Sequence, residues 1–417
     1  MAKIVGGVGV SHTPTIGFAV DRDLGDQESW KPVFDNLGEV KDWLNSVDAD
    51  VLFIIYNDHI TSFFFDHYSA FTLGVDETYS PADEGCGARS LPPINGHPEL
   101  ARHIGQSMME QEFDLSFFRD RALDHGCFSP LSILNLTDGA WDMPIIPLQV
   151  GVLQYPIPTA KRCYNFGQAL KNAIESYPED LRVAVLGTGG LSHQVHGERS
   201  GFNNPSWDHE FLKLLEENPE ELTKLTHAEY AVRSGAEGVE IIMWLIMRGA
   251  LGEKVTKVQD SYYLPSMTAI ATLILEPDSE AAAEKEAIEV GRQLNGIEAI
   301  EGTYPFSLER AAGAYKLNHF LHELVKSDFR KAFKAEPEKL MREAGLEAGD
   351  IDLIRNRDWQ GLIRRGATFF VLEKLGAATG VSNPEIYAGM KGITLEELLA
   401  TRNSNMTYSV SGEQSSE

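Results

Sequence analysis

Three of the twelve histidines occupy the same kind of position, soon after a short apolar run: His12 within two residues, His59 within three, and His193 after a turn at residues 187–190. The runs are predicted to be buried parallel strands, because their hydrophobicity is continuous rather than alternating. In order, they are Lys3–Val10, Val51–Tyr56 and Arg182–Leu186. Parallel strands place their carboxyl ends at one edge of a sheet, where ligands of such sheets bind, so the three imidazoles are expected to converge.

Two histidines and one carboxylate that leave one face of a metal open form a site for non-haem Fe(II). The carboxylate is expected from residues 235–244 (GAEGVEIIMW), where acidic residues begin a very apolar helix. Glu240 is followed by seven uncharged residues, and a carboxylate buried there must be paired or bind a metal. Glu237 is the alternative ligand, or its charge only favours the helix N-terminus. Because Zn²⁺ also binds two histidines and a glutamate, a zinc hydrolase is an alternative function.

Two further histidines, His125 and His196, lie in segments whose sequence pattern does not by itself indicate a catalytic role. The glycine and proline in residues 123–130 (LDHGCFSP) predict a loop that contains His125. Asp124 in this loop could orient a neighbouring imidazole. By itself this pattern favours a structural loop histidine. His196, three residues after His193, is interpreted as its structural neighbour.

The elements that must position these residues alternate between strands and helices. Two more buried parallel strands are predicted at Ile145–Leu153 and Ala269–Leu275. Apolar residues at helical spacing predict helices at Trp30–Val47, Pro98–Glu110, Ala160–Ser176 and Leu222–Met247. This alternation predicts an α/β fold, with a mostly parallel or mixed sheet flanked by helices.

The character of the chain changes after residue 276. A charged helix is expected at Glu280–Leu294, and a linker at Gly296–Gly302. Almost only helical patterns follow, at Leu317–Phe333, Pro337–Ala344, Trp359–Ala378 and Leu395–Ala400. We therefore expect a catalytic α/β domain over residues 1–295 and a smaller all-helical domain with a polar tail over residues 296–417.

Composition excludes several classes of partner. The chain has 417 residues and a formal net charge of −26, which repels phosphate backbones and anionic lipid, so neither nucleic acid nor membrane is an expected partner. A small anionic substrate is not excluded, because a local pocket can be positive. Three cysteines without a CxxC pair, and a start without a signal-peptide pattern, predict a cytoplasmic protein.

Five separated motifs resemble, in order and spacing, the catalytic β subunit of protocatechuate 4,5-dioxygenase, a type II extradiol ring-cleaving dioxygenase. They are residues 9–14 (GVSHTP), 56–59 (YNDH), 124–126 (DHG), 192–199 (SHQVHGER) and the Glu240 helix. Residues 302–399 resemble, more diffusely, the small helical α subunit of the same enzyme. A fusion with the catalytic part first is the arrangement of gallate dioxygenases. The resemblance therefore favours gallate as the substrate, with protocatechuate as the alternative.

The resemblance also implies roles for individual residues. His12, His59 and Glu240 are implied to be Fe(II) ligands, His193 an acid/base residue beside the metal, and His125 a second active-site histidine near the substrate. Candidates for substrate binding, from a hydroxyl-bearing loop and from the helical domain, are Ser266, Thr268, Glu373, Tyr387 and Tyr408.

The implied partners are dioxygen and gallate, or a related dihydroxybenzoate, in a homodimer. The implied product is a 4-oxalomesaconate-type acid of aromatic catabolism. A non-catalytic binding protein on the same scaffold is the alternative of another class. The intact set of ligand and accessory histidines counts against it.

Overall fold

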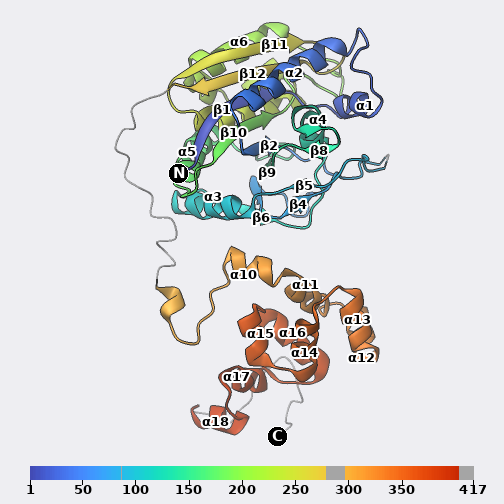
Figure 1. Ribbon diagram of the computed structural model, residues 1–417, viewed down its shortest axis with the longest axis vertical. Coiled ribbons are helices and arrows are strands. Elements are labelled where there is room, and N and C mark those ends of the chain that lie inside the picture. The colour runs from blue at the N-terminus through green and yellow to red at the C-terminus, as the bar shows by residue number, and fades with distance from the viewer. Residues whose placement is uncertain (86, 279–295, 403–417) are drawn as a thin grey trace. The chain divides into compact units, whose positions relative to one another are not determined.

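A computed structural model of the protein describes residues 1–85, 87–278 and 296–402, and its contacts divide the chain into two compact units, Met1–Arg292 and Gln293–Glu417 (Figure 1). The first unit is a mixed sheet flanked by helices and the second is helical, which confirms the predicted fold class. The boundary predicted between residues 295 and 296 stays a prediction. The charged helix predicted at Glu280–Leu294 lies outside the described residues.

An eight-stranded mixed sheet forms the centre of the first unit, in the order β11-β12-β1-β10-β2-β9-β3-β6. The strands are β1 Lys3–Val10, β2 Val51–Tyr56, β3 Phe71–Gly74, β6 Ser116–Phe118, β9 Ile145–Val150, β10 Arg182–Thr188, β11 Val255–Tyr263 and β12 Ile270–Pro277. Two short antiparallel pairs lie outside this sheet, β4 Thr78–Tyr79 with β5 Ile94–Asn95, and β7 Leu136–Thr137 with β8 Ala140–Trp141. Four of the five predicted strands, β1, β10, β2 and β9, are parallel neighbours.

The fifth predicted strand, β12, is antiparallel to β1, so the expectation of a parallel strand there was wrong. Its other neighbour is the edge strand β11, which the hydrophobic pattern did not predict. All nine residues of β11 are exposed or half-buried, and the strand pairs on one side only. A strand of this kind lacks the continuous apolar run of a central strand.

Helices cover both faces of the sheet. One face packs against α1 Pro14–Asp21, α2 Lys31–Ser46 and α4 His125–Leu134. The other face packs against α3 Pro98–Glu110, α5 Ala160–Glu175, α6 Pro205–Glu217, α7 Pro219–Thr223, α8 His227–Ser234, the 3₁₀ helix η1 Glu237–Met243 and α9 Trp244–Ala250. All six residues of β2 are buried, since alternate side chains enter the two cores.

Glycines in β1 allow large side chains to pack directly on its backbone. A Cβ atom on Gly6 would lie 2.5 Å from the indole of Trp43 in α2. A Cβ atom on Gly9 would lie 2.3 Å from the indole of Trp244 in α9. The strand that ends just before His12 is therefore held between two tryptophans from opposite faces.

The segment Leu222–Met247, predicted as one helix, is divided into several. Thr226 caps the start of α8. Its hydroxyl accepts a hydrogen bond from the backbone nitrogen of Glu229, and the Glu229 carboxylate accepts one from the backbone nitrogen of Thr226. Gly235 ends that helix with φ of 88°, and a Cβ atom there would lie 2.2 Å from the carbonyl oxygen of His193. The break therefore lets this segment approach the backbone of a predicted site residue.

The second unit consists of helices around its own apolar core. They are η3 Ile297–Ala299, α10 Leu308–Gly313, α11 Tyr315–Glu323, α12 Ser327–Ala335, α13 Pro337–Glu343, α14 Ala348–Asn356, α15 Trp359–Arg365, α16 Phe369–Thr379, α17 Asn383–Lys391 and α18 Leu395–Ala400. Two segments predicted as single helices are each divided, at residues 324–326 and at Gly366. Arg330 donates to the carbonyls of Leu324 and Val325 at the first break. Gly366, with φ of 116°, forms the second.

Across the described part of both units, no helix is long and apolar enough to cross a membrane.

Candidate active site

The carboxyl ends of β1, β10 and β2 lie side by side and bring the three predicted histidines to one cavity. The ring centroids of His12 and His59 are 5.1 Å apart. His193 follows the middle strand of the three and lines the same cavity. The convergence expected from parallel strands is therefore present.

His125 also reaches this cavity, but from a helix rather than from the predicted loop. Asp124 caps α4 by accepting a hydrogen bond from the backbone nitrogen of Gly126 at 3.0 Å, so the segment is helical in spite of its glycine and proline. The His125 ring stacks on His59 with centroids 4.0 Å apart. His12, His59 and His125 each offer a ring nitrogen, and the three atoms lie within 4.8 Å of one another, a spacing at which one metal ion could be held.

Glu240 is buried at the same cavity, in η1. One carboxylate oxygen lies 3.7 Å from Nε2 of His12, and the other lies 3.9 Å from Nε2 of His193. The backbone nitrogen of Gly190 donates to this second oxygen at 2.5 Å. The carboxylate is thus placed between two imidazoles, although it lies outside the tighter group of three histidines.

Glu237, the alternative acid, is engaged elsewhere. It accepts a hydrogen bond from the backbone nitrogen of Val195 at 3.1 Å, and its other oxygen pairs with Nδ1 of the exposed His196. Glu237 also lines the cavity, but its carboxylate is directed to this pair. Of the two acids, Glu240 is the one that faces the converging histidines.

Each of the four imidazoles is held through Nδ1, and Nε2 of His59 also accepts a hydrogen bond from the side-chain amide of Asn57 at 3.2 Å. The contacts are His12 to Thr188 Oγ1 at 2.9 Å, His59 to Asp124 Oδ2 at 2.8 Å, His125 to Glu84 Oε2 at 2.5 Å and His193 to Leu191 O at 2.7 Å. Where the partner is a carboxylate or a carbonyl, Nδ1 carries the hydrogen and Nε2 the lone pair. Contacts of this kind orient histidines that bind metals.

The electrostatics of the cavity favour neutral His12 and anionic Glu240. Burial lowers the pKa of His12. Burial acts on His59 in the same direction, but the hydrogen bond and charge of Asp124 outweigh it and raise the pKa. Burial alone would raise the pKa of Glu240, whereas the neighbouring imidazoles, His12 first, lower it to about 2. A carboxylate anion beside a neutral imidazole is a favourable pair of ligands for a cation.

The cavity has a volume of about 400 Å³, within the range of small-molecule sites. It is lined by His12, Thr13, Pro14, Thr15, His59, His125, Leu153, His193, Val195, Glu237, Glu240, Pro265, Ser266, Met267, Thr268 and Ile270. The predicted substrate residues Ser266 and Thr268 are among them, on the loop between β11 and β12. Ser266 is exposed and Thr268 half-buried, which places both at the entrance rather than at the floor.

The remaining predicted residues belong to the helical unit. Glu373 in α16 accepts a hydrogen bond from Asn383 at 2.6 Å. Tyr387 in α17 stacks on Phe369 with ring centroids 4.9 Å apart, and 40% of it is exposed. Tyr408 lies outside the described residues. A contact of these three with substrate stays a prediction.

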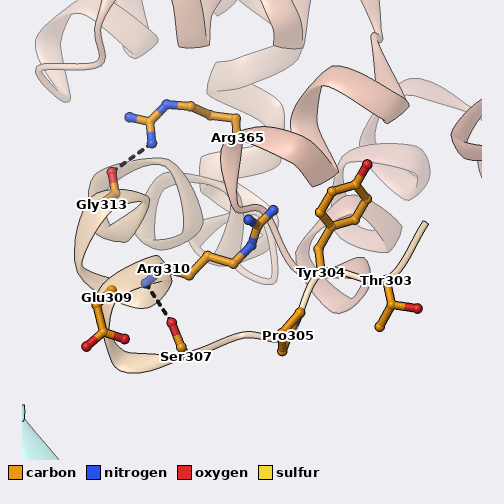
Figure 2. Close-up of a pocket in the computed structure, with 8 residues that line it drawn as sticks. All are labelled: Thr303, Tyr304, Pro305, Ser307, Glu309, Arg310, Gly313 and Arg365. Atoms are coloured by element: carbon orange, nitrogen blue, oxygen red, sulfur yellow. Dashed lines mark hydrogen bonds between the residues drawn. The ribbon is translucent and has the colours of Figure 1, made fainter. Parts of the chain in front are cut away.

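A second cavity, of about 520 Å³, lies within the helical unit (Figure 2). Arg310 and Arg365 line it, but both are already engaged. Arg310 donates to the carbonyls of Ile363 and Arg364, and Arg365 donates to the carbonyl of Gly313 at 2.7 Å. These guanidinium groups tie segments of the unit together, and this cavity contains none of the histidines.

Two residues that orient the histidines were not predicted. Thr188 belongs to the strand β10, where its hydroxyl is one among many in the sequence. Glu84 lies in the segment 83–87 (DEGCG), 41 residues before His125. An acidic residue in a glycine-containing segment is common in loops, so only the contact identifies it.

Family models match two parts of the chain. The catalytic LigB subunit of aromatic ring-opening dioxygenase matches residues 6–274, and the LigA subunit of the aromatic-ring-opening dioxygenase LigAB matches residues 317–403. The two matches follow the division into an α/β unit and a helical unit.

Curated relatives agree with the family models. Gallate dioxygenase of Pseudomonas putida is 58% identical over 335 residues, which cover 79% of this chain and 98% of the relative. A 2,3-dihydroxyphenylpropionate/2,3-dihydroxicinnamic acid 1,2-dioxygenase of Photorhabdus laumondii is 28% identical, over 61% of this chain and 91% of the relative. The enzyme of that name from Escherichia coli is 25% identical, over 58% and 88%. With both subunit types matched in order, the chain belongs to the type II extradiol dioxygenases, the aromatic ring-opening enzymes with a LigB catalytic domain.

Proposed function

We propose that this enzyme opens the ring of gallate by Fe(II)-dependent extradiol cleavage, with a 4-oxalomesaconate-type acid as the product, in aromatic acid catabolism. The main support for gallate as the substrate is the 58% identity to a protein named gallate dioxygenase. The order of the matched domains, LigB before LigA in one chain, supports the same choice.

We propose His12, His59 and Glu240 as the metal ligands. Nε2 of His12 is buried without a hydrogen-bond partner, and its 3.7 Å separation from a Glu240 oxygen suits a shared ion. Two imidazoles and a carboxylate are the donor set of non-haem Fe(II) oxygenases. A fourth protein ligand would occupy a position that the reactants need, so His125 is assigned to the substrate.

When bound, ferrous iron supplies one centre at which two adjacent ring hydroxyls and dioxygen meet. We assign His193 to accept the proton that a ring hydroxyl of the substrate loses on binding. Its Nδ1 donates to the carbonyl of Leu191, so Nε2 carries a lone pair and faces the cavity beside Glu240. A neutral imidazole in this position is a suitable general base, and it can return the proton later in the cycle. His125 accepts a hydrogen bond from another ring hydroxyl.

The substrate's carboxylate needs its own partners. No Lys or Arg lines the cavity in the described part of the chain, so hydroxyl groups at the entrance are the available donors. Ser266 and Thr268 supply them. Tyr387, Tyr408 and Glu373 are proposed to complete the binding site from the helical domain, contributed within a homodimer by the same chain or by its partner.

Oxygen uptake tests the proposed function directly. The full chain is purified anaerobically and loaded with Fe(II), and gallate is added with air-saturated buffer. We expect one dioxygen consumed per gallate, and a ring-opened tricarboxylic acid that retains both oxygen atoms, identified by mass spectrometry. Absence of uptake with both gallate and protocatechuate would contradict the proposal. A higher kcat/KM for protocatechuate than for gallate would make protocatechuate the substrate.

The His193→Ala variant distinguishes a role of His193 in acid/base catalysis from a role in metal binding. We expect it to retain iron and to lose turnover. Loss of iron instead would make His193 a ligand.

A further inference from the structure

Glu84 makes a two-point contact with His125. One carboxylate oxygen lies 2.5 Å from Nδ1 of His125, and the other accepts a hydrogen bond from the backbone nitrogen of His125 at 2.8 Å. Both oxygens of one carboxylate are therefore directed at one residue. Glu84 is an exposed residue, with 31% of its side chain accessible, whereas His125 is buried.

The segment that carries Glu84 is held in register with the residue before Asp124. The backbone nitrogen of Ala82 donates to the carbonyl of Leu123 at 2.8 Å, and that of Leu123 donates to Ser80 at 2.9 Å. The two chain segments that meet in the Glu84–His125 contact are thus joined by a pair of backbone hydrogen bonds just before it.

Arg89 anchors the chain beyond this segment. Its guanidinium forms a two-point ion pair with Asp21 of α1, at 2.8 and 2.7 Å. It also donates to the carbonyls of Phe128 and Gly17, at 3.0 and 3.1 Å. Because Phe128 lies in α4, the helix that begins with His125, Arg89 ties the Glu84 chain segment to the helix that Glu84 contacts.

The neighbouring acid, Asp83, has a different task. One of its oxygens accepts from the backbone nitrogens of Gly85 and Gly87, at 2.8 and 2.9 Å, and so shapes the turn. It makes no contact with a histidine among the described residues. Asp83 is therefore a matched control for Glu84, because it is a carboxylate on the same segment.

We propose that Glu84 is a positioning residue that holds His125 with the hydrogen on Nδ1 and the lone pair on Nε2, so that this ring accepts a hydrogen bond from a substrate hydroxyl. This inference rests on the proposed function, since it deepens the role of His125 there. Glu84 is a carboxylate and can only accept, so Nδ1 must donate to it. Nε2 is then an acceptor. It can bind a hydroxyl and would repel a carboxylate oxygen.

The consequence is a preference among ring substituents. Gallate carries a third hydroxyl next to the adjacent pair, and protocatechuate has hydrogen at that position. If Nε2 of His125 accepts from the third hydroxyl, Glu84 contributes to the choice of gallate. In a glutamine at position 84, the amide oxygen is needed as the acceptor for the backbone nitrogen of His125, so the NH₂ group faces Nδ1. This favours the opposite tautomer and turns Nε2 into a donor.

Nuclear magnetic resonance of the imidazole nitrogens tests the proposal without turnover. The full chain, labelled with ¹⁵N at histidine and loaded with Zn(II) to avoid broadening by iron, is compared with Glu84→Gln and Asp83→Asn. A His125→Gln variant assigns the ring. We expect hydrogen on Nδ1 of His125 in the wild type and in Asp83→Asn, and hydrogen on Nε2 in Glu84→Gln. The same tautomer in all three proteins would overturn the proposal.

Kinetics of the Fe(II)-loaded variants give the second readout. Glu84→Gln is expected to lower kcat/KM for gallate by about tenfold, the effect of losing one hydrogen bond to the substrate, and to lower it less for protocatechuate. Iron content should stay at the wild-type value. Loss of bound metal in Glu84→Gln would instead make Glu84 a ligand, and an equal loss in Asp83→Asn would show a general effect of the segment. Failure of the proposed function would leave the tautomer result unchanged.

Discussion

Four buried or partly buried imidazoles meet in one cavity, and the partner of each Nδ1 determines what its Nε2 can do. Asp124 and Glu84 pair with two stacked rings, whereas His193 rests on a backbone carbonyl. Such partners fix the tautomer and the orientation of each ring. Rings of identical type therefore can differ in role because their neighbours differ.

A prediction at this scale concerns the two acids of η1. We expect Glu240→Gln to lose bound iron, because an amide is a poor ligand and Glu240 faces both His12 and His193. Glu237→Gln should keep iron, since that carboxylate pairs with His196. Iron content per chain after gel filtration is the measurement. Full occupancy in Glu240→Gln with loss in Glu237→Gln would reverse the assignment.

At the scale of elements, α5 and α9 pack with their backbones in contact, which positions the helix that follows the Glu240 segment. A Cβ atom on Gly167 would lie 2.1 Å from the carbonyl oxygen of Ile246, and one on Gly249 would lie 2.2 Å from that of Tyr164. Because the contacted atoms belong to the backbone and cannot rotate away, a larger residue at either position requires the two helices to shift.

Gly167→Ala is therefore expected to lower the free energy of unfolding by about 1–3 kcal/mol through overpacking. Gly38→Ala is the control, because Gly38 lies inside α2 and its Cβ would meet nothing within 4 Å. That change should raise stability by about 0.4–1 kcal/mol, as alanine reduces the entropy of the unfolded chain. Urea unfolding measures both. Similar losses in the two variants would contradict the packing argument.

The contact between α3 and α5 predicts a dependence on pH. His103 in α3 lies 2.9 Å from the hydroxyl of Ser176, and burial lowers its pKa. Below the unfolded pKa of about 6.5, the unfolded chain binds more protons at this site, so the free energy of unfolding falls as pH decreases, until the folded pKa is passed.

His103→Asn should therefore flatten the decrease in stability below pH ~6.5. Urea unfolding at closely spaced pH values measures it, with His67→Asn as the control, since His67 is exposed. An unchanged slope in His103→Asn, or an equal flattening in the control, would show that His103 does not contribute.

At the scale of the whole molecule, the net charge of −26 surrounds a cavity that is proposed to take an anionic acid. The proposed divalent cation and the histidines that do not bind it would offset the negative surface potential locally, at the cavity. The homodimer and the cytoplasmic location stay predictions of the sequence. So does the participation of the helical unit in substrate binding.

Tyr387→Phe tests that participation. We expect KM for gallate to rise by about tenfold, the effect of losing one hydrogen bond to a charged group, with iron content unchanged. Tyr304→Phe is the control, because Tyr304 is a tyrosine of the same unit that lines the other cavity (Figure 2). Steady-state oxygen uptake measures both. Equal effects, or none in Tyr387→Phe, would place the substrate away from Tyr387.

The sequence alone was sufficient for the α/β class, the parallel core and the convergence of His12, His59 and His193. Each of these follows from local pattern: a continuous apolar run forms a buried strand, and parallel strands end at a common edge. The family motifs added Glu240 and His125, which periodicity left open or interpreted as structural.

Only the tertiary structure decided the direction of β12, the helical state of His125, the break at Gly235 and the contact of Glu84. These depend on partners distant in the sequence: β1 and β11 for β12, His193 for Gly235, and His125 for Glu84. A hydrophobic pattern reports which side chains avoid water, and does not report which polar groups meet across the fold. The residues that give each histidine its tautomer therefore became visible only when the chain was folded.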